Sequence, residues 1–88
     1  MKIKRHPQFN KHFQARIAGR VNLVARFYER VELFISQPFH PILQNHGLTG
    51  KYREYRSISI TGDIRVIYRE LENDTVLFFD IGTHNQVY

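Results

Sequence analysis

Apolar residues recur at helical spacing near the start of the chain. Phe9, Phe13 and Ile17 lie four positions apart, which predicts a short helix over residues 7–17 with one apolar stripe. Pro7 suits the first helical position, because its missing N–H would have no partner there. Gly19 then interrupts the pattern.

The next segment, residues 20–36, carries a stronger helical pattern. Its apolar positions follow one another at steps of three, three and one, repeated, and Pro38 and Pro41 end it. We therefore predict two antiparallel helices with a buried seam between them. The positions that define the second helix are Val21, Val24, Phe27, Tyr28, Val31, Phe34 and Ile35.

The remaining segments alternate as strands do. Residues 1–6 predict a short first strand, and residues 52–60, 63–71 and 75–82 predict three more after the polar connector 39–50. The turns fall at "TG" (61–62) and "END" (72–74). The element order is thus strand, two helices, and three strands.

Parity fixes the register of the first predicted hairpin. Ile58 and Ile60 share a core face with Ile64, Val66 and Tyr68 only if residue 60 pairs with residue 64. We therefore expect a three-residue loop over 61–63, with its central glycine in an unusual backbone conformation.

The opposite face of the same hairpin is polar and basic. A face of this kind suits phosphates and stacked bases, although a solvated sheet face has the same appearance. We expect it to display Ser57, Ser59, Arg65, Ile67 and Arg69, with Lys51, Arg53 and Tyr55 further along.

Composition narrows the function. The 88 residues suffice for one domain, 1–88, and the net charge of +5 with a pI near 9.9 favours polyanionic partners. The absence of cysteine excludes disulfides and thiolate metal sites. Because no apolar run approaches the roughly 20 residues of a membrane span and no secretory signal begins the chain, we expect a cytoplasmic protein without membrane contact.

The second half of the chain resembles the YafQ-like branch of the RelE/ParE toxin superfamily. The matching residues are His46-Gly47-Leu48-Thr49-Gly50, the aromatic and basic segment 52–56, Gly62-Asp63, Ile67-Tyr68, Gly82-Thr83-His84 and Tyr88. The order of elements in the first half also agrees with the family.

The resemblance implies an α+β fold of order β-α-α-β-β-β, with a twisted antiparallel sheet backed by two helices. It also implies a toxin of a type II toxin–antitoxin system that cleaves mRNA, usually on the ribosome, without a metal or other cofactor. A cognate antitoxin would inhibit it, and we expect an acidic or amphipathic segment to dock near Phe27, Tyr28 and Phe34.

Four residues are candidates for metal-independent RNA cleavage, in which the 2′-hydroxyl attacks the adjacent phosphorus. Histidine can move protons near neutral pH, so His84 is the candidate acid and His46 the candidate base or phosphate-positioning group. Arg65 can bind the scissile phosphate through paired donors. Asp63 can act as a base or orient a histidine, or serve only the turn.

Other residues are candidates for RNA contact, namely Lys51, Arg53, Arg56, Ser59 and Tyr88. Two positions depart from the family pattern. Ser59 stands where many relatives carry a further histidine, and Ile64 stands where relatives often carry tryptophan. His6, His12 and His40 lack motif context and receive no role, and we expect His12 to be exposed.

Three alternatives to an RNA-cleaving toxin remain open. A ParE-like toxin would inhibit DNA gyrase, although that side of the superfamily generally lacks the histidine pair. An RNA-binding protein would use the basic face without cleavage. Two histidines and a carboxylate could instead form a metal site.

Overall fold

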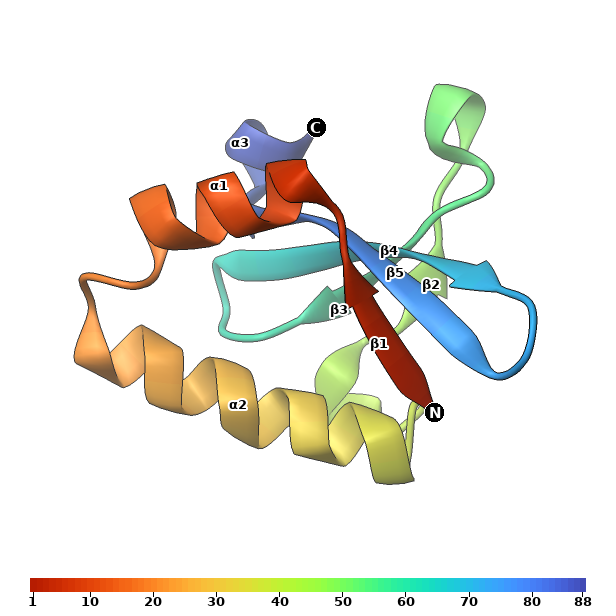
Figure 1. The fold of residues 1–88 in the computed structure, drawn as a ribbon, viewed down its shortest axis with the longest axis horizontal. Coiled ribbons are helices and arrows are strands. Elements are labelled where there is room, and N and C mark those ends of the chain that lie inside the picture. Colours follow the sequence, from red (N-terminus) through yellow and green to blue (C-terminus); the bar gives the residue numbers. More distant parts are fainter.

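A five-stranded sheet forms one layer, and helices α1 and α2 pack against one of its faces (Figure 1). The computed structural model describes residues 1–88. The strands lie in the order β1-β5-β4-β3-β2, so the first and last long strands of the chain are neighbours. The elements are β1 (Lys2–Arg5), α1 (Pro7–Arg16), α2 (Val21–Ser36), β2 (His46–Gly47), β3 (Arg56–Ser59), β4 (Ile64–Leu71), β5 (Thr75–Thr83) and α3 (His84–Val87), with short 3-10 turns η1 (Pro41–Leu43) and η2 (Gly50–Tyr52).

The predicted α+β class is confirmed, and the predicted order of strand, two helices and three strands is present with the short elements β2 and α3 in addition. The strand predicted over 52–60 is confined to Arg56–Ser59. Strand direction also departs from the predicted antiparallel sheet. β1 pairs with β5 in parallel, from Lys2 opposite Thr75 to Arg5 opposite Phe78, whereas the other strand pairs are antiparallel. The sheet is therefore mixed. β1 ends where α1 begins, which leaves the last residues of β5 without a strand on that side.

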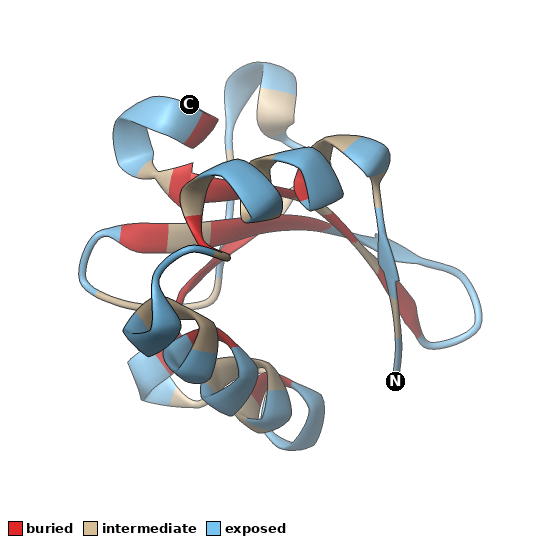
Figure 2. Cartoon of the chain, turned by 60° about the vertical axis from the view of Figure 1, so that its left-hand side comes forward, coloured by how far each residue is buried: buried red, intermediate tan, exposed pale blue.

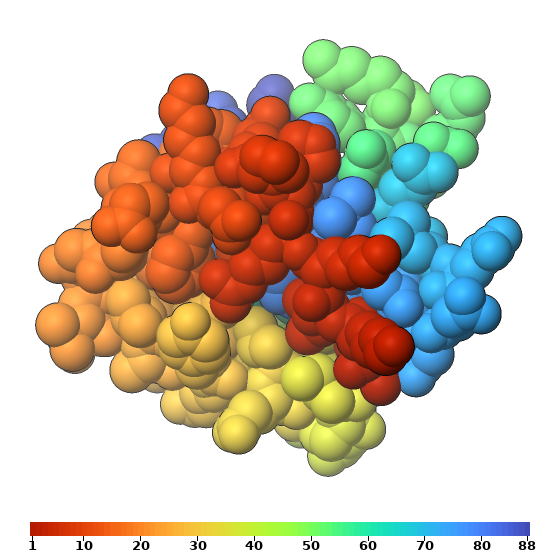
Figure 3. All heavy atoms as spheres, viewed as in Figure 1, coloured from red at the N-terminus to blue at the C-terminus, as the bar shows by residue number.

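The two helices run in opposite directions, as predicted (Figure 1). Aromatic side chains pack between them. The Phe13 and Phe27 rings meet edge to face with centroids 5.0 Å apart, and the Arg5 guanidinium lies 5.6 Å from the Phe27 centroid. Figure 2 shows buried residues along β4 and β5 and on the inner sides of the helices. Figure 3 shows atoms of β1 and α1 covering the middle of the helical face.

The predicted antitoxin anchors on α2 differ in exposure. Phe27 and Phe34 belong to the core and are at most 1% exposed, so they offer nothing to a partner in this conformation. Tyr28 is half-exposed and remains available. The prediction of three apolar anchors was wrong for the two phenylalanines, because helical periodicity marks an apolar face without saying which residues lie deepest.

The β3–β4 hairpin has the predicted register. Ser59 pairs with Arg65, and the Ile60 N–H donates to the Ile64 carbonyl, so residues 61–63 form the loop. The prediction for Gly62 was wrong, because its φ is not positive. The Thr61 hydroxyl stabilises the turn instead, by accepting from the N–H groups of Asp63 and Ile64.

The predicted open basic face is covered in part. Ser57, Ser59 and Ile67 are buried, whereas Lys51, Arg53 and Arg69 are exposed. Segment 48–55 forms a loop that is closed by the Leu48 N–H donating to the Tyr55 carbonyl. Tyr55 packs on Phe79 with ring centroids 5.2 Å apart. The face therefore holds a second, smaller aromatic cluster, which two-residue alternation could not reveal.

No helix has the length and apolar character required to cross a bilayer.

Candidate active site

Three of the predicted catalytic residues line one pocket. His46 comes from β2, Arg65 from β4 and His84 from the start of α3, and the pocket lies where these segments converge. Its full lining is His46, Leu48, Thr49, Tyr52, Arg65, His84 and Tyr88. Residues that are distant in sequence thus present two imidazoles and a guanidinium to a common space.

A second pocket adjoins the first and contains the fourth predicted residue, Asp63. Arg65 and His84 line both pockets and therefore lie between them. The lining of this second pocket is entirely polar or glycine: Gly62, Asp63, Arg65, Thr83, His84 and Asn85.

His46 is held in a defined tautomer. Its Nδ1 lies 2.8 Å from the Gln44 carbonyl oxygen, which can only accept a hydrogen bond, so Nδ1 carries the hydrogen. In the neutral ring, Nε2 is then unprotonated and able to take a proton. The bend that allows this contact comes from Gln44 itself, whose φ of 48° is left-handed.

His84 is placed by the capping of α3. The Thr83 N–H donates to Gln86 Oε1 at 2.8 Å, and the Thr83 side chain caps the helix in return. The exposed His84 ring lies against Tyr88, with centroids 4.6 Å apart. The backbone that carries the candidate acid is therefore fixed while its ring stays open to solvent.

Arg65 is supported from both neighbouring strands. It lies opposite Gly82 on β5 and Ser59 on β3, and its Nη1 donates to Ser59 Oγ at 3.4 Å. Ser59 Oγ donates in turn to Gln44 Oε1 at 2.8 Å. Because Ser59 is only 7% exposed and both contacts are internal, its side chain is better placed to orient Arg65 than to touch RNA.

Asp63 occupies an exposed position in the hairpin turn. Its backbone N–H donates to the Thr61 hydroxyl, but its carboxylate forms no ion pair or hydrogen bond. The carboxylate is therefore free to respond to a ligand in the pocket that it lines with Arg65 and His84.

The predicted RNA-contacting residues fall into two groups. Tyr88 lines the histidine pocket, and the exposed Lys51 lies close by, 5.2 Å from the ring centroid of Tyr52. Arg53 is exposed and follows η2. Arg56 lies apart from the pocket, because its Nε donates to Asn45 Oδ1 at 2.9 Å within a network that includes Tyr68.

The other histidines serve the fold. His6 Nδ1 accepts from the Gln8 N–H at the start of α1, and His40 Nδ1 accepts from the Ile42 N–H at the start of η1. His12 was predicted to be exposed, which is wrong: its Nδ1 lies 2.6 Å from Asp80 Oδ1, and its side chain is 24% exposed. The pairing was hidden because Asp80 lies in the last strand.

Sequence reasoning also missed Gln44. Its carbonyl fixes the His46 ring, and its side chain accepts from Ser59. The only available signal was its place two residues before His46, in the polar connector after Pro38 and Pro41. No group of three or more His, Cys, Asp or Glu side chains is arranged to hold a metal ion, so the ligand set that the sequence allowed is not assembled.

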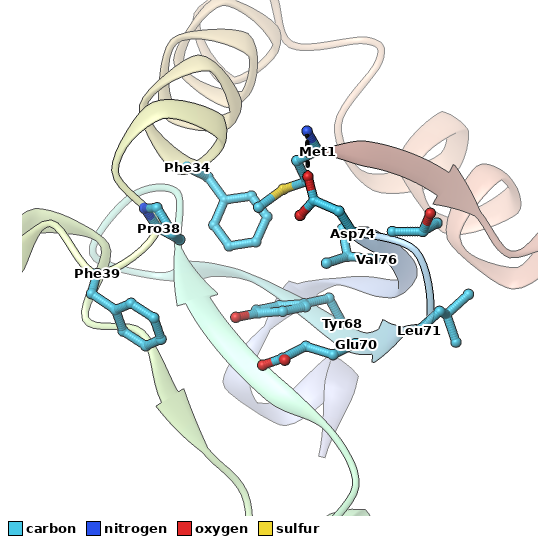
Figure 4. A pocket seen from close by; sticks show the side chains of 10 residues that line it. Met1, Phe34, Pro38, Phe39, Tyr68, Glu70, Leu71, Asp74 and Val76 are labelled. Atoms are coloured by element: carbon cyan, nitrogen blue, oxygen red, sulfur yellow. Dashed lines mark ion pairs between the residues drawn. The ribbon is translucent and has the colours of Figure 1, made fainter.

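A separate apolar pocket lies between the end of α2 and the β4–β5 hairpin (Figure 4). Tyr68 forms part of its wall, and the Met1 amino group closes one side by pairing with Asp74 at 3.1 Å. Burial raises the pKa of the Tyr68 hydroxyl, while the hydrogen bond with Asn45 and the charge of Arg56 act in the opposite direction. The pocket contains none of the candidate catalytic residues.

Comparison with known proteins places this arrangement in a family. The whole chain, residues 1–88, matches the sequence profile described as "Bacterial toxin of type II toxin-antitoxin system, YafQ". No curated protein sequence matches it significantly.

Solved structures share its fold. The YafQ structure from E. coli strain BL21(DE3) has a TM-score of 0.83 at 20% identity, covering 99% of this chain and 97% of that one. YafQ in the E. coli DinJ-YafQ toxin-antitoxin complex gives 0.81 at 21% identity, with coverages of 99% and 96%. The YoeB/ParE toxin from Agrobacterium tumefaciens gives 0.79 at 18% identity, with coverages of 96% and 99%. The chain belongs to the YafQ family of bacterial type II toxin–antitoxin toxins.

Proposed function

We propose that this toxin is an endoribonuclease that cleaves mRNA on the ribosome, using its own histidines rather than a metal. The observation that carries the proposal is the common pocket of His46, Arg65 and His84. Two proton-transferring rings and a cation facing one space are the groups required to move a phosphodiester through a pentacoordinate intermediate.

In the proposed reaction, the 2′-oxygen of RNA attacks the adjacent phosphorus. His46 Nε2 takes the 2′-hydroxyl proton, and the phosphorus–5′-oxygen bond breaks. Protonated His84 gives its proton to the departing 5′-oxygen. The products are a 2′,3′-cyclic phosphate and a 5′-hydroxyl, so atoms and protons balance.

Arg65 neutralises the charge that develops on the non-bridging oxygens, and Ser59 orients its guanidinium. Asp63 supplies a negative charge in the adjoining pocket, which Arg65 and His84 also line. Tyr88 and Lys51 hold the RNA, through stacking and backbone charge respectively, while the exposed Arg53 adds a more distant phosphate contact. Arg56 contributes through the fold, since its guanidinium is engaged with Asn45.

The proposed regulator is a cognate antitoxin. YafQ of E. coli forms a complex with DinJ, and the family is defined by toxin–antitoxin pairing. A net charge of +5 favours an acidic partner segment. Co-purification with the product of the adjacent gene tests this part, and no complex at micromolar concentration would contradict it.

The decisive experiment maps new 5′ ends in a translating extract. The wild type should create 5′-hydroxyl ends within mRNA, and His84→Ala should lower the cleavage rate by about 100-fold or more. His40→Gln is the matched control, because His40 caps η1 outside both pockets. DNA gyrase inhibition with intact RNA, or binding of RNA without cleavage, would overturn the proposal.

A further inference from the structure

Three side chains of α1 contact the end of β5, which leads directly into His84. Gln8, His12 and Arg16 recur every four residues on one side of α1, and all three approach Asp80 of β5. Gln8 Nε2 donates to Asp80 Oδ2 at 3.2 Å, His12 Nδ1 lies 2.6 Å from Oδ1, and Arg16 Nη1 lies 3.6 Å from Oδ1. Asp80 is 5% exposed, so three partly exposed side chains surround a buried carboxylate.

Arg16 also donates a hydrogen bond to the outer edge of β5, where no further strand pairs. The pairing of β1 with β5 ends at Phe78, so the outer edge of β5 has no strand partner beyond that point. Arg16 Nη1 donates to the Ile81 carbonyl at 2.9 Å and thereby satisfies one of the exposed edge groups. The helix thus holds β5 at the point nearest the candidate acid.

Gly82 lies so close to the side chains of Arg16 and Gln86 that no Cβ fits at this position without displacing them. A Cβ at this position would lie 2.8 Å from Arg16 Nη1 and 2.7 Å from Gln86 Oε1. Gln86 in turn accepts from the Thr83 N–H at the start of α3. Arg16 and Gln86 therefore both pack against Gly82, immediately before Thr83 and His84.

We propose that Arg16, oriented by Asp80 and His12, is a positioning residue for His84. The effect on cleavage rate rests on the proposed function. The contact of Arg16 with β5 does not, because it exists whatever reaction the protein catalyses. Loss of Arg16 should let residues 81–84 move by a fraction of an ångström or more, and proton transfer is sensitive to such displacement.

The test compares Arg16→Gln, Arg16→Lys and the control Arg26→Gln on cleavage by the intact toxin with programmed ribosomes. Arg16→Gln should lower the single-turnover rate at saturating toxin by about 10- to 100-fold, with the half-saturating concentration unchanged within about twofold. Arg16→Lys should recover only part of the rate. One nitrogen, Nη1, makes both contacts, so an ammonium can replace it in charge, but the lysine side chain is shorter and lacks the rigid planar guanidinium. Arg26 makes only a 3.9 Å contact with Glu29, so its variant should match the wild type.

A second variant and a spectroscopic readout make the proposal independent of folding defects and of the nuclease assay. Gly82→Ala should displace the Arg16 and Gln86 side chains and reproduce the rate loss. In both variants, NMR should show a shifted His84 Cε1–Hε1 signal and faster backbone motion at residues 81–84. Unchanged His84 signals would overturn the inference, as would a changed half-saturating concentration with an unchanged rate. If the wild type fails to cleave RNA, the proposed function falls, and the NMR comparison still decides whether Arg16 positions His84.

Discussion

Ser59 and Arg65 face each other across β3 and β4, and Arg65 Nη1 donates to Ser59 Oγ at 3.4 Å. The serine therefore connects the guanidinium to Gln44, whose backbone carbonyl also fixes His46. One short chain of hydrogen bonds thus couples the cation of the pocket to one of its imidazoles.

Ser59→Ala should lower RNA cleavage without abolishing it. The Arg65 donor is charged, but at 3.4 Å its hydrogen bond to Ser59 is long and weak, so loss of this support predicts a reduction of about 2- to 10-fold, or about 0.5–1.5 kcal/mol. Ser59→Thr retains the hydroxyl and serves as the control. A reduction as large as that of Arg65→Ala would mean that Ser59 contacts the RNA itself.

His46→Ala should lower the single-turnover rate by about 100- to 10,000-fold, because the proposed reaction then lacks its base. The ring is exposed and its one hydrogen bond is to Gln44, so the melting temperature should stay close to that of the wild type. Single-turnover cleavage and thermal denaturation, measured on the same preparation, check both expectations. A rate within threefold of the wild type would remove His46 from the mechanism.

Asp63→Asn separates a catalytic role from a turn role. Asparagine keeps the turn preference of aspartate, and the Asp63 N–H to Thr61 contact does not involve the side chain. We expect the free energy of unfolding to change by less than about 0.5 kcal/mol. Cleavage should fall by about tenfold as the charge beside Arg65 and His84 disappears. Equal activity in the two proteins would leave Asp63 with the turn alone.

Asp80→Ala should destabilise the fold. The carboxylate is buried and satisfies groups from Gln8 and His12 as well as the Ile81 N–H. Removing one partner of such a cluster leaves buried donors unpaired, for an expected loss of about 2–4 kcal/mol. Urea denaturation measures this loss. Asp74→Ala is the control, since the Asp74 carboxylate is largely exposed and pairs only with the chain terminus.

Tyr68 should ionise at higher pH than an ordinary tyrosine, because burial raises the pKa of its hydroxyl above 10.0. The unfolded chain loses that proton first, so stability should fall as the pH rises from about 10 through the folded-state pKa. Absorbance of tyrosinate follows the titration of the wild type. Tyr68→Phe should remove the ionisation step that occurs at the highest pH. Loss of an early step instead would contradict the assignment.

Local pattern was enough for much of the fold. The four-residue spacing of Phe9, Phe13 and Ile17 identified α1, and the parity of Ile60 and Ile64 gave the loop length and register of the β3–β4 hairpin. These inferences succeeded because helical and strand periodicities are local consequences of backbone geometry.

The candidate site was predictable only in its members. His46, Asp63, Arg65 and His84 were identified from motifs, yet their proximity depends on strand order, in which β4 lies between β3 and β5. The burial of Ser57, Ser59 and Ile67 and the pairing of His12 with Asp80 had no local signal.

By itself, the sequence determined the two long helices, most of the strands, the register of one hairpin and the residue types available for RNA chemistry, since each depends on neighbours along the chain. Only the tertiary structure decided that β1 joins β5 in parallel, which face is covered, and that Arg16 supports the strand before His84. Those features arise from contacts between residues far apart in sequence, where packing and the satisfaction of buried polar groups select one arrangement.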